Sequence, residues 1–309
     1  MSTERSRRCV AVVITQVVFV FLAGLVTALA TGLGALPFFL FDKISDRWNV
    51  ALWGLASGIM LAASGFGLVR EGLAASEGFP TLLLAGLGAG VVLVVVADFV
   101  LDRVEIGEDG GEAVEADGVE TTTPERTDGG QPDADAPLAS QAVADGDARK
   151  LLLILGILTV HSFPEGVAVG VSFADVGLDG GVPVAGVTVP VLAVFMTVAI
   201  SIHNVPEGVA VSIPLRSLGV SEPRMVAAAV FSSLPQPVGA VIAFLFVSWA
   251  RAFLPFGFGF AAGAMVFLVV TEFIPEALAI GERLDGNGYR ELTAGVVAGV
   301  VGMLPLLLY

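Results

Sequence analysis

Runs of about 20 apolar residues recur along the whole chain, a length that lets a helix cross the hydrocarbon core of a bilayer. The chain is 55% hydrophobic and only 15% charged, with a mean hydropathy of +0.88, whereas soluble domains carry about 25% charged residues. The sequence therefore predicts an all-α polytopic membrane protein with eight transmembrane helices. The predicted segments are 9–40, 49–70, 80–101, 150–174, 186–213, 223–250, 253–280 and 290–309.

One long connector interrupts this pattern. Residues 104–148 hold 13 acidic residues and one basic residue, Arg126, which favours a solvated, disordered segment. We therefore divide the single transmembrane domain into helices 1–3 (1–103), an acidic disordered loop (104–148) and helices 4–8 (149–309). The single cysteine, Cys9, excludes an intrachain disulfide and a cysteine metal cluster.

The distribution of Lys and Arg predicts the orientation. Ten of the 15 lie in loops on one side of the predicted membrane and five on the other. Because the cytoplasmic side carries the excess, we expect a multi-pass plasma-membrane protein with both termini outside and residues 104–148 in the cytoplasm.

The only two histidines each open a copy of one motif inside an apolar run. HSFPEGVAV starts at His161 and HNVPEGVAV starts at His203, and the copies match at seven of nine positions. Fainter copies follow in the next two segments, SSLPQPVGA and EFIPEALA. Ionisable residues at membrane depth are costly and usually mark functional sites, so a purely structural role for both copies is disfavoured.

The spacing in each copy predicts a metal site. His161 and Glu165 are four residues apart and share one helix face, as do His203 and Glu207. Two such helices packed face to face supply enough N and O ligands for a four-coordinate Zn²⁺ or another first-row divalent ion. The site is thus expected in the core formed by the fourth and fifth helices.

The prolines and glycines of the motifs support a polar pathway. Pro164 and Pro206 lack an N–H and bend their helices, and the carbonyls they free need protein, water or an ion as a partner. Gly166 and Gly208 allow neighbouring helices to approach closely. Two other functions stay open on these residues: an intramembrane zinc metalloprotease, although H-E-x-x-H is missing, and a metal-free proton-conducting protein that uses the same four side chains.

HSFPEG and HNVPEG resemble the signature of the ZIP (Zrt/Irt-like) divalent-metal transporters, and most closely the GufA-like prokaryotic branch. ATGLGALPFF, SGIMLAASGF, SSLPQPVGA and TEFIPEA add to the resemblance. It implies eight helices and transport of zinc into the cytoplasm, not enzymatic activity, by alternating access with an elevator-like slide. Because no G-x-x-x-x-G-K-[ST] motif is present, transport is expected to follow a gradient.

The resemblance also implies a ligand set. In the family pattern a methionine of the second helix joins the two motifs, so the expected metal ligands are His161, Glu165, His203, Glu207 and Met60. Zn²⁺ is the expected cargo, and Fe²⁺, Mn²⁺, Co²⁺ and Cd²⁺ accept similar ligands. The expected partners are the divalent metal ion, membrane lipid and a second copy in a homodimer, with no nucleic acid.

The family pattern includes a second, neighbouring metal position, and this sequence departs from the pattern there. Ser162 follows the first histidine, Asn204 follows the second, and Gln236 replaces a glutamate of the sixth helix. Asn204 agrees with the family pattern, which has Asn or Asp there, and Ser162 stands where Asn is common. Because the change at Gln236 removes a carboxylate, we expect one strong metal position and a weakened second one. Glu272 and Glu276 are expected to line the cytoplasmic exit.

Overall fold

Helices form nearly all of the described structure. The computed structural model describes residues 2–41, 44–108, 148–177 and 181–305. The helical elements are α1 (Ser2–Leu33), η1 (Leu36–Phe39), α2 (Asp46–Ala62), η2 (Ala63–Val69), α3 (Arg70–Ala74), α4 (Thr81–Glu108), α6 (Ala148–Ser172), α7 (Val191–Ser217), α8 (Glu222–Ser232), α9 (Pro235–Trp249), η3 (Arg251–Phe253), α10 (Leu254–Leu268), η4 (Val269–Phe273), α11 (Ile274–Gly281) and α12 (Tyr289–Met303). Of the predicted acidic loop, 104–108 continue α4, and 109–147 lie outside the described residues.

Six stretches of the described chain are long and apolar enough to cross a membrane, which confirms a polytopic, mainly helical protein. They are 11–39, 46–74, 81–100, 191–216, 222–249 and 251–281. The α6 helix has 25 residues and α12 has 15. These two correspond to the remaining segments predicted to span, so the total of eight stays a prediction.

Local chemistry interrupts several predicted helices. The predicted fifth helix begins too early, because Val182–Val184 (β1) and Val187–Val189 (β2) form an antiparallel hairpin before α7. Its two-residue turn, Ala185 and Gly186, has positive φ at both positions, as a tight hairpin turn requires. The sixth helix divides into α8 and α9 at Pro235, which cannot continue the hydrogen bonding of α8. The second and seventh helices contain the π-helical segments η2 and η4.

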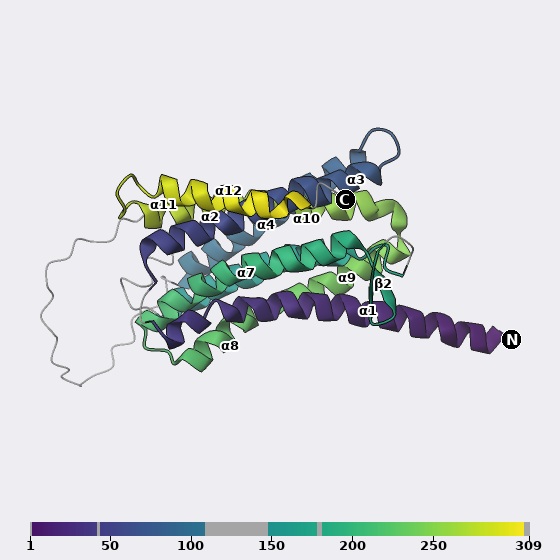
Figure 1. The fold of residues 1–309 in the computed structure, drawn as a ribbon, viewed down its shortest axis with the longest axis horizontal. Helices are drawn as coiled ribbons and strands as arrows, with labels where there is room; N and C mark the ends of the chain where they lie inside the picture. Colours follow the sequence, from purple (N-terminus) through teal and green to yellow (C-terminus); the bar gives the residue numbers. More distant parts are fainter. Residues whose placement is uncertain (1, 42–43, 109–147, 178–180, 306–309) are drawn as a thin grey trace, which may run out of the picture.

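The helices pack as two groups (Figure 1). In the first, α1 packs against α7 and α9, and α6 packs against α9 and α7, with α8 covering one end; we call it the site group. In the second, α2 packs against α12 and α11, and α10 packs against α4, with η2, α3 and η4 completing it; we call it the support group. Figure 1 shows the start of α1 and the end of α12 toward the end of the bundle that carries the hairpin.

Packing within each group brings helix backbones together. Five glycine pairs with four-residue spacing occur where two helices of one group meet, a pattern that favours close helix association. A Cβ added at any of them would lie 2.1–2.5 Å from a carbonyl oxygen of the partner helix. The pairs are Gly54 and Gly58, Gly86 and Gly90, Gly166 and Gly170, Gly259 and Gly263, and Gly295 and Gly299.

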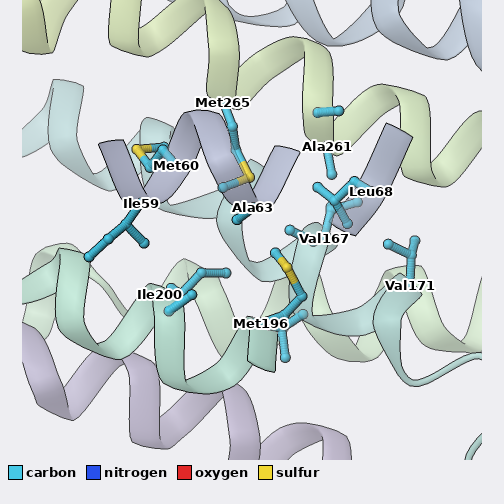
Figure 2. Packing of buried hydrophobic residues seen from close by; sticks show 14 of the residues in the cluster. Ile59, Met60, Ala63, Leu68, Val167, Val171, Met196, Ile200, Ala261 and Met265 are labelled. Carbon is cyan, nitrogen blue, oxygen red and sulfur yellow. The ribbon is translucent and has the colours of Figure 1, made fainter. Parts of the chain in front are cut away.

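Packing between the groups uses side chains instead. Met60, Ala63, Leu68, Ala261 and Met265 of the support group belong to one buried cluster with side chains of α6 and α7 (Figure 2). Those side chains are Val167, Val171, Met196 and Ile200. The two groups thus meet across an apolar layer that includes flexible methionines.

The loop segments beside the hairpin are tied to the site group. The Gln16 side chain of α1 donates to the carbonyl of Val176 at 2.9 Å, and the Gly177 N–H donates to the carbonyl of Thr188 at 2.7 Å. Arg251, just after α9, donates to the carboxylate of Asp175 at 2.7 Å. These bonds join the α6–α7 connection to α1 and to the end of α9.

Candidate metal centre

The two motifs lie on α6 and α7, which pack together and run antiparallel on either side of the hairpin connection. Both helices continue through their prolines, Pro164 in α6 and Pro206 in α7. Because the helices run in opposite directions, the histidine of one motif is expected beside the glutamate of the other. His203 and Glu165 meet in this way.

Three predicted ligands form one buried cluster. The Nε2 atom of His203 lies 2.9 Å from Oε1 of Glu165 and 3.6 Å from Oε1 of Glu207. One donor atom from each of the three residues lies within 4.8 Å of the others. Zinc bonds of about 2.0–2.2 Å at tetrahedral angles separate neighbouring donors by about 3.3–3.6 Å. A small adjustment of these side chains would therefore admit a divalent ion.

His161 lies apart from this cluster. Its Nε2 atom is 3.2 Å from Oδ1 of Asp98, and the His161 side chain is almost fully buried while that of Asp98 is 29% exposed. Asp98 belongs to α4, so this contact joins the site group to the support group. The prediction that His161 is a metal ligand stays a prediction.

Asp98 is a functional candidate that the sequence reasoning missed. It lies near the end of the apolar run 80–101, and a carboxylate at such a position was itself a signal. No histidine or proline accompanies it in the sequence, so it belongs to no copy of the motif. Packing of α4 against α6 brings it to His161.

The residues of the predicted second position form a network around Glu165. The Gln236 side-chain amide donates to Oε2 of Glu165, and its own oxygen accepts from the Asn204 amide at 3.0 Å. Asn204 also donates to the carbonyl of Thr27 at 2.7 Å, and its Oδ1 is buried with no hydrogen-bond partner among the described residues. Ser162 is buried as well. Gln236 thus occupies the Glu165 carboxylate oxygen that does not contact His203, and the weakened second metal position stays a prediction.

Close glycine contacts explain how this network is assembled. A Cβ on Gly166 would lie 2.2 Å from the carbonyl oxygen of Gln236, so α6 touches α9 directly beside Glu165. A Cβ on Gly208 would lie 1.8 Å from the carbonyl oxygen of Thr31, so α7 touches α1 beside Glu207. The prediction of close helix approach at these glycines is confirmed, although the partner helices are α9 and α1.

The support group contacts the cluster through Phe273 of η4. Its ring stacks on His203 with ring centroids 5.6 Å apart and an interplanar angle of 23°. The Nδ1 atom of His203 is buried without a hydrogen-bond partner among the described residues. The ring therefore has Nε2 facing two carboxylates and an aromatic surface on one face.

The remaining predicted residues lie outside this cluster. Met60 is buried in the apolar layer between the groups (Figure 2). Glu272 in η4 and Glu276 in α11 are partly exposed and flank Phe273 along the chain. Their predicted roles, as metal ligand and as exit residues, stay predictions.

Two carboxylates and an imidazole in a buried space suit a divalent cation. A cation balances the two negative charges, whose burial at membrane depth is otherwise costly. The three side chains come from two helices of one group, and the fourth candidate, His161, lies on one of the same helices. The arrangement can hold an ion between helices without a soluble ligand-binding domain.

Comparison with known proteins gives a consistent match. The sequence pattern of the family described as ZIP Zinc transporter matches residues 14–306. The zinc transporter ZIPB of Bordetella bronchiseptica is 34% identical over 280 residues, covering 89% of this chain and 76% of that protein. The zinc transporter GufA of Myxococcus xanthus is 38% identical over 155 residues, covering 50% of this chain and 54% of GufA.

A longer plant protein is also similar. An Arabidopsis thaliana protein named as a zinc transporter is 38% identical over 254 residues, or 82% of this chain. The match covers only 33% of the plant protein, so the chain spans a minor part of that relative.

Proposed function

We propose that this chain, which belongs to the ZIP zinc transporter family, carries Zn²⁺ across the plasma membrane into the cytoplasm. The observation that carries the proposal is the buried Glu165, His203 and Glu207 cluster, because it offers three donor atoms within 4.8 Å of one another on two helices of the bundle. The chain acts as a transporter, not as an enzyme. Fe²⁺, Mn²⁺, Co²⁺ and Cd²⁺ are further candidate cargoes because they accept the same donor types.

In this proposal the metal site is completed by His161 and Met60. A shift of His161 away from Asp98 would add a second imidazole to the cluster on the α6 side. Met60 is buried on α2, which packs against α7, and would contribute a thioether from the support group. Such a mixed N, O and S set suits zinc.

Eight spans cross the membrane in this proposal, the six apolar stretches together with α6 and α12. An even number of crossings agrees with the start of α1 and the end of α12 lying toward the same end of the bundle (Figure 1). The strongly exposed Trp48 and Trp249 lie at the start of α2 and the end of α9, at opposite ends of the bundle, where membrane interfaces favour tryptophan. Both termini are outside, residues 104–148 are cytoplasmic, and exposed apolar side chains such as Val92 and Val96 face lipid.

Transport proceeds by alternating access, with the site group sliding against the support group. Two features support this motion: glycine contacts between backbones make each group a firm unit, and the groups meet through an apolar layer. Apolar side chains form few directional bonds, so they can exchange neighbours at low cost. Glu272 and Glu276 line the exit, and two copies of the chain form a homodimer.

Zinc flux into proteoliposomes tests the proposal. Purified protein is reconstituted around a zinc-sensitive dye, and the initial rate is measured for the parent, Glu165→Gln, Glu207→Gln and Glu282→Gln. Glu282 is exposed beyond α11, so its substitution is the matched control for loss of one carboxylate. Loss of flux in the first two variants alone supports the site. Unchanged flux in both contradicts it, and proton current without zinc flux would identify a proton conductor.

A further inference from the structure

The two antiparallel copies of the motif predict two equivalent histidine–glutamate pairs, and only one is formed. His203 contacts Glu165 at 2.9 Å. The equivalent partner of His161 would be Glu207, but the His161 ring instead contacts Asp98 at 3.2 Å. The difference arises from the support group, because α4 brings a carboxylate to His161 and η4 brings a phenyl ring to His203.

We propose that Asp98 competes with the metal for His161, so that it holds this histidine out of the site when the site is empty and promotes release of the ion. This inference rests on the proposed transport function. A histidine nitrogen that binds a metal cannot simultaneously donate its proton to a carboxylate. The Nε2 atom of His161 can therefore contact Asp98 or bind the ion, but it cannot do both at once.

The competition is coupled to the arrangement of the helices. His161 belongs to the site group and Asp98 to the support group, so their contact exists only where the two groups bring α6 beside α4. Movement of one group past the other separates the pair and frees His161 for the metal. Phe273 exerts no such competition on His203, because a phenyl ring offers no acceptor comparable to a carboxylate.

The position of Asp98 determines on which side of the metal cluster it competes with the ion for His161. Asp98 lies in the half of α4 that leads into the acidic segment. His161 lies one helical turn before Glu165 on α6, which begins after that segment. The contact is therefore on the cytoplasmic side of the cluster in the proposed orientation. Loss of His161 as a ligand would make the bound ion accessible from the cytoplasmic side.

The proposal predicts that the purified protein binds zinc more tightly when Asp98 is replaced. Asp98→Asn keeps the shape of the side chain but removes its charge, so His161 is held less strongly. We expect zinc to bind about 5-fold more tightly, which corresponds to about 1 kcal/mol, and Asp98→Ala to shift the affinity further in the same direction. Titration calorimetry in detergent measures both, with Asp285→Asn in an exposed loop as the matched control.

The second measurement is the effect of Asp98 when its partner is absent. In a His161→Ala background, Asp98→Asn should leave the zinc affinity unchanged, whereas general structural damage or direct metal binding by Asp98 would still weaken it. Proteoliposome uptake by Asp98→Asn should show a lower KM and an about 5-fold lower maximal rate, because release is slower. Weaker zinc binding by Asp98→Asn, or an equal shift in the His161→Ala background, would overturn the proposal.

The failure of this inference can be told from failure of the transport function. Zinc flux that survives His203→Ala would contradict the proposed site whatever Asp98 does. Zinc flux that requires His203, together with weaker binding by Asp98→Asn, would leave the transporter intact and indicate that Asp98 supports metal binding, either as a ligand or through His161.

Discussion

The two histidines occupy the same position in nearly identical motifs, yet they have different surroundings. His203 is fully buried between two carboxylates of the site group, and its ring face meets Phe273. His161 is directed to Asp98 across the boundary between the groups. The difference teaches that sequence repetition determines which helix face bears a ligand, whereas the neighbouring helices determine what that ligand contacts.

Removal of His203 should have the largest effect. His203→Ala deletes the donor that faces both glutamates, and substitutions that only support a ligand already weaken metal sites by about 10- to 100-fold. We expect zinc uptake to fall by more than about 100-fold in proteoliposomes, with the protein still eluting as a monodisperse peak. Uptake within about 3-fold of the parent would show that the cluster is not the transport site.

Removal of His161 should have a smaller effect, because the variant loses a ligand and the competing contact together. We expect His161→Ala to lower uptake by about 10- to 100-fold. The measurement is the ratio of the two histidine variants at equal zinc concentration. A larger loss for His161 than for His203 would reverse the comparison drawn from the structure.

A change at Gln236 tests the surroundings of Glu165 on the side away from His203. Gln236→Glu replaces the donating amide with a carboxylate, so the second oxygen of Glu165 is released and one negative charge is added. We expect a second zinc ion per chain, or tighter binding of the first, in metal analysis after dialysis. Gln236→Ala is the control, since it releases the same oxygen without adding charge. If Gln236→Glu changes neither the number of zinc ions per chain nor the affinity for the first ion, the weakened second position is contradicted.

Substitution of Phe273 should have the smallest effect. Phe273→Leu keeps an apolar contact with His203 but removes ring stacking, which is worth about 0.5–1.5 kcal/mol between aromatic rings. We expect a loss of zinc affinity of about 3-fold, read by the same titration. Phe253→Leu, at a ring that packs on Phe246 at the end of α9, is the matched control; an equal loss in both variants would remove any special role for Phe273.

Much of the fold followed from the sequence because membrane-length apolar runs have few alternatives. The hairpin before α7 was missed because valines suit strands as well as helices, and the turn at Ala185 and Gly186 lies within one apolar run. The predicted segment 223–250 was treated as one helix, whereas Pro235 begins a new one.

The site was predictable in its chemistry and less so in its contacts. The four-residue spacing and repeated motif led to Glu165, His203 and Glu207 because those features determine a shared helix face. Asp98 comes from a helix with no copy of the motif, and Phe273 lies in the fainter copy EFIPEALA, which has no histidine. Their approach to the two histidines depends on packing between the groups, which spacing along one helix does not encode.

Because hydrogen bonds tie the α6–α7 connection to α1 and η3, a label on the hairpin would move with the site group during transport. Ala185 at the hairpin tip and Glu77 between α3 and α4 are both exposed, and they belong to different groups. Cysteines introduced at these two positions could carry spin labels, once Cys9 is replaced, because no other native thiol is present. If the groups slide, the label separation should change when zinc is added to the parent and stay constant in the His203→Ala background.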